Sequence, residues 1–72
     1  MYVIRKIGAK IQYFVDRNKS KDMWWSEDLD MAFVFVSRKA AKNMAAIQRF
    51  GTHQVVTLDS ARKFYNITKP KK

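Results

Sequence analysis

Three neighbouring carboxylates are the first candidates for chemistry in this chain of 72 residues. Glu27, Asp28 and Asp30 could hold Mg²⁺ or act as general acid and base, because protein carboxylates serve both purposes. They directly follow Ser26, however, and a serine followed by acidic residues is typical of a helix start, where N–H groups lack partners. We therefore predict a structural role for these side chains, with no bound metal and no cofactor.

Other candidates for catalysis are few. His53 is the single histidine, and no cysteine is present that could act as a nucleophile or a zinc ligand. Ser26, Ser37 and Ser60 stand where helix N-caps are expected, and no G-x-S-x-G motif surrounds them. Two glycines do not suffice for a loop that cradles phosphate. The sequence predicts a protein without enzymatic activity, with His53 at the surface or on an edge strand.

The charge of the chain is large and unevenly distributed. Its formal net charge is +9, from 15 basic and 6 acidic residues. Residues 1–21 carry six basic and one acidic side chain, residues 22–36 carry four acidic and none basic, and residues 37–72 carry nine basic and one acidic. Such an excess attracts polyanions, although it also keeps a small domain soluble. We favour a polyanionic or acidic partner.

The basic residues at the two ends of the chain are the predicted nucleic-acid contacts. Lysine and arginine grip phosphates, and aromatic side chains beside them stack on unpaired bases. This combination suits RNA or a single strand better than duplex DNA read by sequence, because no helix-turn-helix, zinc-finger or RNP signature is present. The predicted contacts are Arg5, Lys6, Lys10, Arg17, Lys19, Lys21, Arg62 and Lys63, with Tyr65 as the stacking residue.

Two alternatives belong beside this prediction. Phe64 and Tyr65 could complete a small core instead of meeting a base, since such a domain needs large anchors. The basic helix positions Arg38, Lys39, Lys42 and Arg49 are more typical of a solvated face than of a binding face.

The acidic segment and its tryptophans support a second function. Through this segment the protein could bind and inhibit a host defence protein, toxin or transcription factor without touching nucleic acid, or it could mimic a basic ligand of an acidic target. The same segment could also be the docking site for a basic protein partner. The surface for that partner consists of Trp24, Trp25, Glu27, Asp28 and Asp30. A weak homodimer through unpaired sheet edges is a third possibility, beside a monomer.

The elements that position these residues can be predicted from the apolar pattern. Residues 2–7 and 10–15 are rich in β-formers around Gly8 and Ala9, which predicts a hairpin. A helix over residues 3–15 also fits the spacing, but Gly8 would cost it ~1 kcal/mol. Residues 16–22 form a polar loop, or the tip of a longer hairpin if the sheet extends to residues 23–25. Of the two tryptophans that follow, one is expected in the core and the other at the surface.

The second half of the chain predicts one main helix and one further strand. Leu29, Ala32 and Phe35 pack inward from a short turn, and Ser37 caps a helix over residues 38–50 that ends with Gly51 in the left-handed conformation. Residues 52–58 form a central or helix-covered strand. Ser60 caps a short helical turn over residues 61–65, and residues 66–68 are ambiguous.

Together these elements predict one α+β domain over residues 1–68. It has three or four antiparallel strands with one main helix packed across them, in the order strand, strand, short turn, helix, strand. Residues 69–72 are expected to form a basic, disordered tail. No stretch approaches the ~20 apolar residues of a membrane span. The first residues, MYVIRK, lack the layout of a secretory signal, so we expect a cytoplasmic protein with no membrane partner.

One segment resembles a family of small phage-encoded proteins. The resemblance lies in the motif Trp25-Ser26-x-Asp28-Leu29-x-x-Ala32-x-x-Phe35-x-Ser37, preceded by a strand pattern like Tyr2-Val3-Ile4 and followed by a helix and a Val55-Val56 strand. It covers roughly residues 2–58. The resemblance implies a compact α+β fold and a phage accessory or host-takeover role, located in the host cytoplasm. It implies no activity, since the family is functionally diverse.

Overall fold

The computed structural model describes residues 1–68 and confirms the predicted α+β class. A four-stranded antiparallel sheet has the strand order β3-β2-β1-β4. The elements are, in chain order, β1 (Tyr2–Ile7), β2 (Ile11–Phe14), β3 (Trp25–Ser26), the 3₁₀ helix η1 (Leu29–Met31), α1 (Arg38–Ile47), β4 (Gln54–Thr57) and α2 (Leu58–Thr68). The predicted tail 69–72 lies outside the described residues.

Strands β1 and β2 form the predicted hairpin, which excludes the helix considered for residues 3–15. Arg5 pairs with Tyr13 and Ile7 with Ile11, and the N–H of Gly8 donates to the Lys10 carbonyl at 3.2 Å across the turn. On its other side β1 pairs with β4, with Val3 opposite Val56. Within the described chain β4 pairs with β1 alone, so the strand predicted as central or helix-covered is an edge strand covered by helices.

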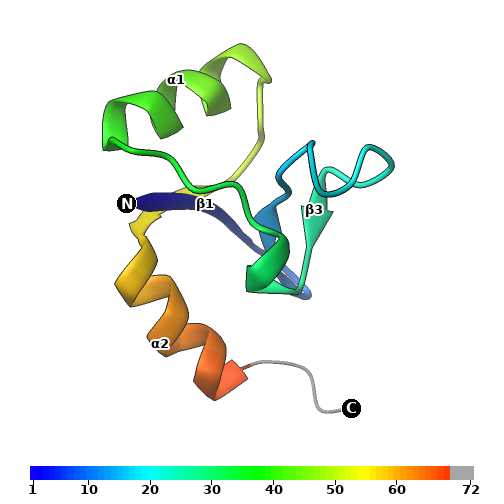
Figure 1. The fold of residues 1–72 in the computed structure, drawn as a ribbon, viewed down its shortest axis with the longest axis vertical. Helices are drawn as coiled ribbons and strands as arrows, with labels where there is room; N and C mark the ends of the chain where they lie inside the picture. The colour runs from blue at the N-terminus through cyan, green and yellow to red at the C-terminus, as the bar shows by residue number, and fades with distance from the viewer. Residues whose placement is uncertain (69–72) are drawn as a thin grey trace.

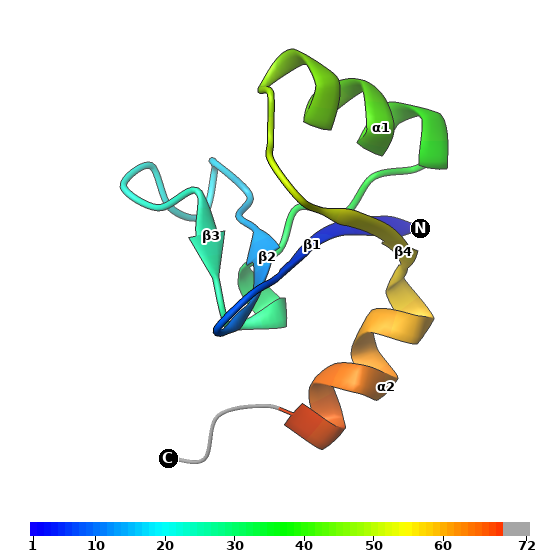
Figure 2. The same cartoon turned by 180° about the vertical axis from the view of Figure 1, so that it is seen from behind.

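The sheet lies between the two helices (Figures 1 and 2). Because side chains alternate along a strand, each face of the sheet needs its own cover. One face packs on α1, with a core that includes Ile4, Phe14 and Phe35. The other face packs on η1 and α2, with a core of Val3, Tyr13, Leu29, Ala32 and Ala61. The inward packing predicted for Leu29, Ala32 and Phe35 is confirmed, since each is at most 5 % exposed.

Helix α2 is longer than the predicted helical turn over residues 61–65. It has 11 residues, and its inner face carries Leu58, Ala61 and Tyr65 at helical spacing. These side chains cover the second face of the sheet, and the packing of Leu58 on that core explains why the helix begins before residue 61. The predicted cap Ser60 lies inside the first turn, where its N–H donates to Thr57 Oγ1 at 3.1 Å. Thr57 therefore provides the cap.

Helix α1 begins as predicted but ends early. Ser37 Oγ accepts the N–H of Ala40 at 3.1 Å, which confirms the N-cap. The helix ends at Ile47, and Arg49, not Gly51, adopts the left-handed conformation with φ of 52°. The N–H of Phe50 donates to the Ala45 carbonyl at 3.1 Å and that of Arg49 to the Ala46 carbonyl at 3.2 Å. This is a Schellman motif, and the accompanying apolar contact joins Phe50 to Ala45 in one core cluster.

The early end of α1 brings Phe50 into an aromatic cluster. Its ring lies 5.1 Å from that of Phe14 and 4.9 Å from that of Trp25, centroid to centroid. Trp25, which pairs with Phe14 across β3 and β2, is therefore the tryptophan that joins the core. Trp24 remains 44 % exposed. Neither helix of the described chain has the length and apolar composition that crossing a membrane requires.

We predict that Arg49→Gly stabilises the fold. A residue with a Cβ atom costs about 1 kcal/mol or more in the left-handed region, and glycine removes most of this cost. We expect the free energy of unfolding to rise by about 1 kcal/mol, with Tm about 4–8 °C higher. Arg49→Ala is the control because it keeps the Cβ atom, and thermal and urea unfolding are the measurements. Equal stability of the Gly and Ala variants would contradict strain at this position.

Candidate functional site

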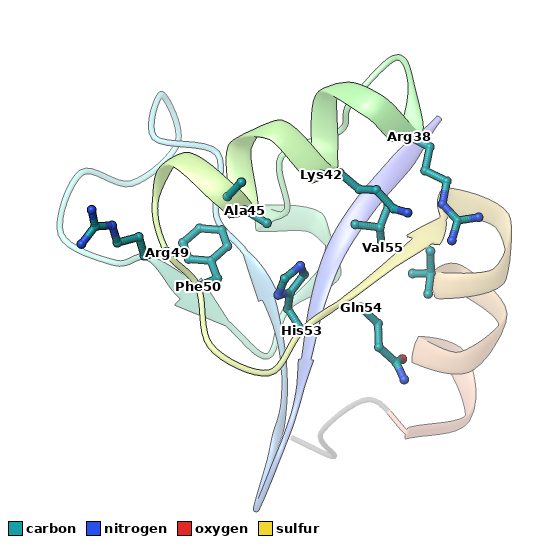
Figure 3. A pocket seen from close by; sticks show the side chains of 10 residues that line it. Arg38, Lys42, Ala45, Arg49, Phe50, His53, Gln54 and Val55 are labelled. Atoms are coloured by element: carbon teal, nitrogen blue, oxygen red, sulfur yellow. The ribbon is translucent and has the colours of Figure 1, made fainter.

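An open groove of about 780 Å³ lies between α1 and the edge strand β4 (Figure 3). One wall is the side of α1 and the residues just after it, and the other wall is the start and middle of β4. The groove is lined by Arg38, Lys42, Ala45, Ala46, Arg49, Phe50, His53, Gln54, Val55 and Val56. Its volume is in the range of sites that bind ligands.

The groove is cationic and contains no acidic side chain. Arg38, Lys42 and Arg49 contribute three positive charges to its lining. No hydrogen bond or ion pair within residues 1–68 engages these three side chains. The sequence explains the imbalance, since residues 31–58 contain four basic residues and no acidic one. The charges are therefore available to an anion from outside the molecule.

Helical spacing places the basic residues on the same side of α1. Arg38 and Lys42 are four residues apart, so they lie one above the other on the helix. Ala45 and Ala46 follow on the same side, and their small side chains leave room between the helix and β4. The left-handed turn at Arg49 then carries the chain across to the second wall.

His53 extends into the groove from the segment that leads into β4 (Figure 3). Its Nδ1 lies 2.8 Å from the carbonyl oxygen of Gly51. A carbonyl only accepts hydrogen bonds, so Nδ1 carries the proton in this contact and Nε2 is left for another partner. The half-buried ring also meets Phe50 edge to face, with centroids 6.4 Å apart. The contact with Gly51 and the packing on Phe50 hold the imidazole in one orientation.

Four of the predicted nucleic-acid contacts are engaged within the molecule. Arg5 donates to Gln54 Oε1 at 2.6 Å and lies 4.7 Å from the Phe64 ring centre. Arg17 donates to the carbonyls of residues 21 and 23 and stacks on Trp24 at 4.4 Å. Lys19 donates to the carbonyl of residue 30 at 2.7 Å, and Lys10 lies 3.8 Å from a Glu27 carboxylate oxygen. Arg5 and Arg17 thus hold structure together.

The other predicted basic contacts are exposed but scattered. Lys21 is in the loop before β3, and Arg62 and Lys63 are on α2, across the sheet from α1. Lys6 lies 5.3 Å from the Trp25 ring centre, on the α1 side of the sheet. Trp25 in turn contacts Phe50, so Lys6 is the predicted contact that the structure connects to the groove.

Tyr65, the predicted stacking residue, is half-buried and packs against the core. Its ring meets that of Tyr13 edge to face at 6.1 Å, and its hydroxyl donates to Asp28 Oδ1 at 3.2 Å. Burial, with the negative charge and hydrogen bond of Asp28, raises the pKa of Tyr65 above its usual value. This arrangement matches the alternative in which Tyr65 completes the core.

The acidic segment is organised by turns. Asp28 caps η1 through a hydrogen bond from the Asp30 N–H at 2.9 Å, and Ser26 Oγ accepts from the Asp28 N–H at 3.0 Å. Among the described residues no three metal-binding side chains gather into a potential metal site. A second, smaller groove of about 440 Å³ lies here, lined by Lys10, Gln12, Met23, Ser26, Glu27, Asp28 and Tyr65. Met23 is exposed beside these carboxylates, and Trp24, which precedes them in the chain, is exposed and stacks with Arg17.

The groove was not predicted from the sequence, which assigned Arg38, Lys42 and Arg49 to a solvated face. The signal that could have indicated it is the absence of acidic residues from 31 to 58. Comparison of the chain with protein-family models, curated proteins and solved structures yields no match. The resemblance to phage accessory proteins therefore stays a prediction.

We predict that Tyr65→Phe lowers stability at neutral pH by about 1 kcal/mol, the contribution of one hydrogen bond. The raised pKa means that the fold favours the neutral phenol. Its contribution to stability is complete below the unfolded-state pKa of ~10 and is lost as pH rises through the folded-state pKa. Urea unfolding at neutral pH and above pH ~10 measures both effects. The variant should lose less stability in alkali than the parent protein, and an equal loss would contradict this role of Tyr65.

Proposed function

We propose that this protein is a non-enzymatic RNA-binding protein that contacts phosphates with the α1–β4 groove. The observation that carries the proposal is the set of three unpaired cations, Arg38, Lys42 and Arg49, in a groove without a carboxylate. A polyanion binds such a surface by releasing its own counterions. Lys6 extends the cationic surface beyond Trp25 and Phe50.

The arrangement of the helices favours RNA over sequence-specific duplex DNA. Recognition in the major groove needs a projecting helix, commonly supported by a second helix beside it. Here α1 and α2 lie on opposite faces of the sheet, and the inner face of each is packed against strands (Figures 1 and 2). The two helices therefore do not form a helix-turn-helix pair. A groove beside a strand can bind phosphates without a helix-turn-helix pair.

The biological setting of the proposal comes from the resemblance to phage accessory proteins. In that setting the protein binds RNA or a host ribonucleoprotein in the cytoplasm, and so modulates host processes or counters a host defence. The activity requires no cofactor and no metal, since binding alone alters the partner.

We predict that Arg38→Gln combined with Lys42→Gln weakens RNA binding and flattens its dependence on salt. Each phosphate contact to a single strand contributes about 0.7 to the slope of log affinity against log salt concentration. Loss of two contacts should reduce that slope by about 1.4. Fluorescence anisotropy with a labelled oligonucleotide between ~50 and ~200 mM salt measures it.

Lys21→Gln combined with Lys63→Gln is the matched control for net charge. Both side chains are exposed, and neither lines the groove. The control should keep most of the affinity and of the salt slope. If the two double variants lose affinity equally, binding depends on net charge and the groove is not the RNA site.

A protein partner on the acidic side is the second candidate function. It is favoured by Met23, which is 41 % exposed and lines the groove with Glu27 and Asp28, and by its chain neighbour Trp24, which is 44 % exposed. Exposed aromatic and methionine side chains are typical of interface centres. Such a partner would identify the protein as an inhibitor that does not touch nucleic acid.

Recovery of the tagged protein from infected cells, with and without nuclease, distinguishes the two functions. We expect partners to be lost after nuclease treatment, with RNA present in the untreated sample. A single host protein retained in both samples, and lost with Trp24→Ala, would establish the second function instead.

A further inference from the structure

We propose that the α1–β4 groove takes a single-stranded nucleic-acid segment and that one unpaired base stacks on the ring of His53. This inference rests on the proposed function and deepens it, because it names the form of the nucleic acid and the residue that contacts a base. His53 was expected to be a surface histidine without a role.

The orientation of the His53 ring is the first argument. The contact between Nδ1 and the Gly51 carbonyl fixes one edge of the imidazole, and Phe50 supports it edge to face. The ring extends into the space between α1 and β4 (Figure 3). A ring already held in place loses little conformational freedom when a base stacks on it. Its Nε2 is available to hydrogen-bond the same ligand.

The position of the cations around this ring is the second argument. Arg38 and Lys42 lie toward one end of the groove and Arg49 toward the other, with His53 between them (Figure 3). A single strand presents phosphates at intervals along its backbone and bases between them. Proteins that bind single strands combine a cationic groove with aromatic stacking platforms in this manner.

A duplex cannot use this arrangement. In a paired and stacked helix the faces of the bases are covered by neighbouring bases, so the His53 ring has no face to contact. A duplex could still bind to the cations through its phosphates, but without the stacking contribution. The groove therefore predicts a preference for single strands that charge alone would not produce.

An acidic peptide is the competing occupant. The outer edge of β4 pairs with no other strand in the described chain, and an extended peptide could add to it with carboxylates toward Arg38 and Lys42. The His53 ring offers a flat face to a base, and an extended acidic peptide has no planar ring of its own to stack there. The position of His53 thus favours a nucleic acid.

Two substitutions at one position separate stacking from charge and from folding. His53→Ala removes the ring, whereas His53→Phe keeps an aromatic face and removes both nitrogens. The probes are a uridine oligonucleotide, a hairpin duplex of equal phosphate number, inorganic polyphosphate and a glutamate homopolymer. Fluorescence anisotropy at one salt concentration measures direct binding of the labelled oligonucleotides. The same signal measures competition by the two polymers. Tryptophan fluorescence checks that each variant is folded.

We expect His53→Ala to weaken binding of the uridine oligonucleotide about 5- to 150-fold, the range for loss of one stacked base. His53→Phe should bind more tightly than His53→Ala because it keeps the aromatic face, although it loses the contact with the Gly51 carbonyl. Competition by polyphosphate should be the same for all three proteins, and the hairpin should bind more weakly than the single strand to the parent protein.

The inference is overturned if His53→Ala binds the single strand as tightly as the parent protein, or if the hairpin and the single strand bind equally. If in either case polyphosphate still binds, and this binding is lost when Arg38 and Lys42 are replaced, the proposed phosphate-binding function remains supported. Tighter binding of the glutamate polymer than of the oligonucleotide would identify a peptide as the occupant. Absence of binding to both oligonucleotide and polyphosphate would contradict the inference and the proposed function together.

Discussion

The burial of β1 on both faces is the constraint on which the rest of the structure depends. Val3 and Ile4 are neighbours in the strand, their side chains point to opposite faces, and each is 0 % exposed. One helix can cover only one face. The chain therefore needs α1 against the face with Ile4, and η1 with α2 against the face with Val3. This demand places the two helices on opposite sides and leaves β4 at an edge, where the groove forms.

Local patterns explain which parts of the fold could be predicted. The hairpin, the Ser37 cap and the Val55-Val56 strand depend on residues close together in the chain, and the structure confirms them. The end of α1 and the length of α2 depend on distant partners. Gly51 has the stronger local preference for the left-handed position, but Phe50 gains burial against Trp25 only if the helix ends before Arg49. Likewise α2 begins three residues earlier than predicted, where Leu58 packs against the core that contains Val3 and Tyr13.

The same distinction applies to the site. Composition predicted a cationic surface, but it could not indicate which cations are engaged within the molecule. Arg5 is held by Gln54, 49 positions away, and Tyr65 by Asp28, 37 positions away. Residues so far apart in the chain meet only because the fold brings their elements together. The cations of α1 escape pairing because no acidic residue lies in the part of the chain that builds their surroundings. The charge balance of residues 31–58 alone therefore indicates which cations stay unpaired, whereas the net charge of the whole chain does not.

The unpaired edge of β4 means that the groove cations also affect whether copies of the protein associate with each other. A strand that pairs on one side only is a template for edge-to-edge association, and natural proteins guard such edges with charge. Arg38 and Lys42 stand along this edge, so like-charge repulsion opposes the association of two copies through it. If the proposed function holds, a polyanion in the groove would neutralise that repulsion. The dispersion of the protein in solution would then be coupled to the occupancy of the groove, and salt that screens the cations would weaken both ligand binding and the protection of the edge.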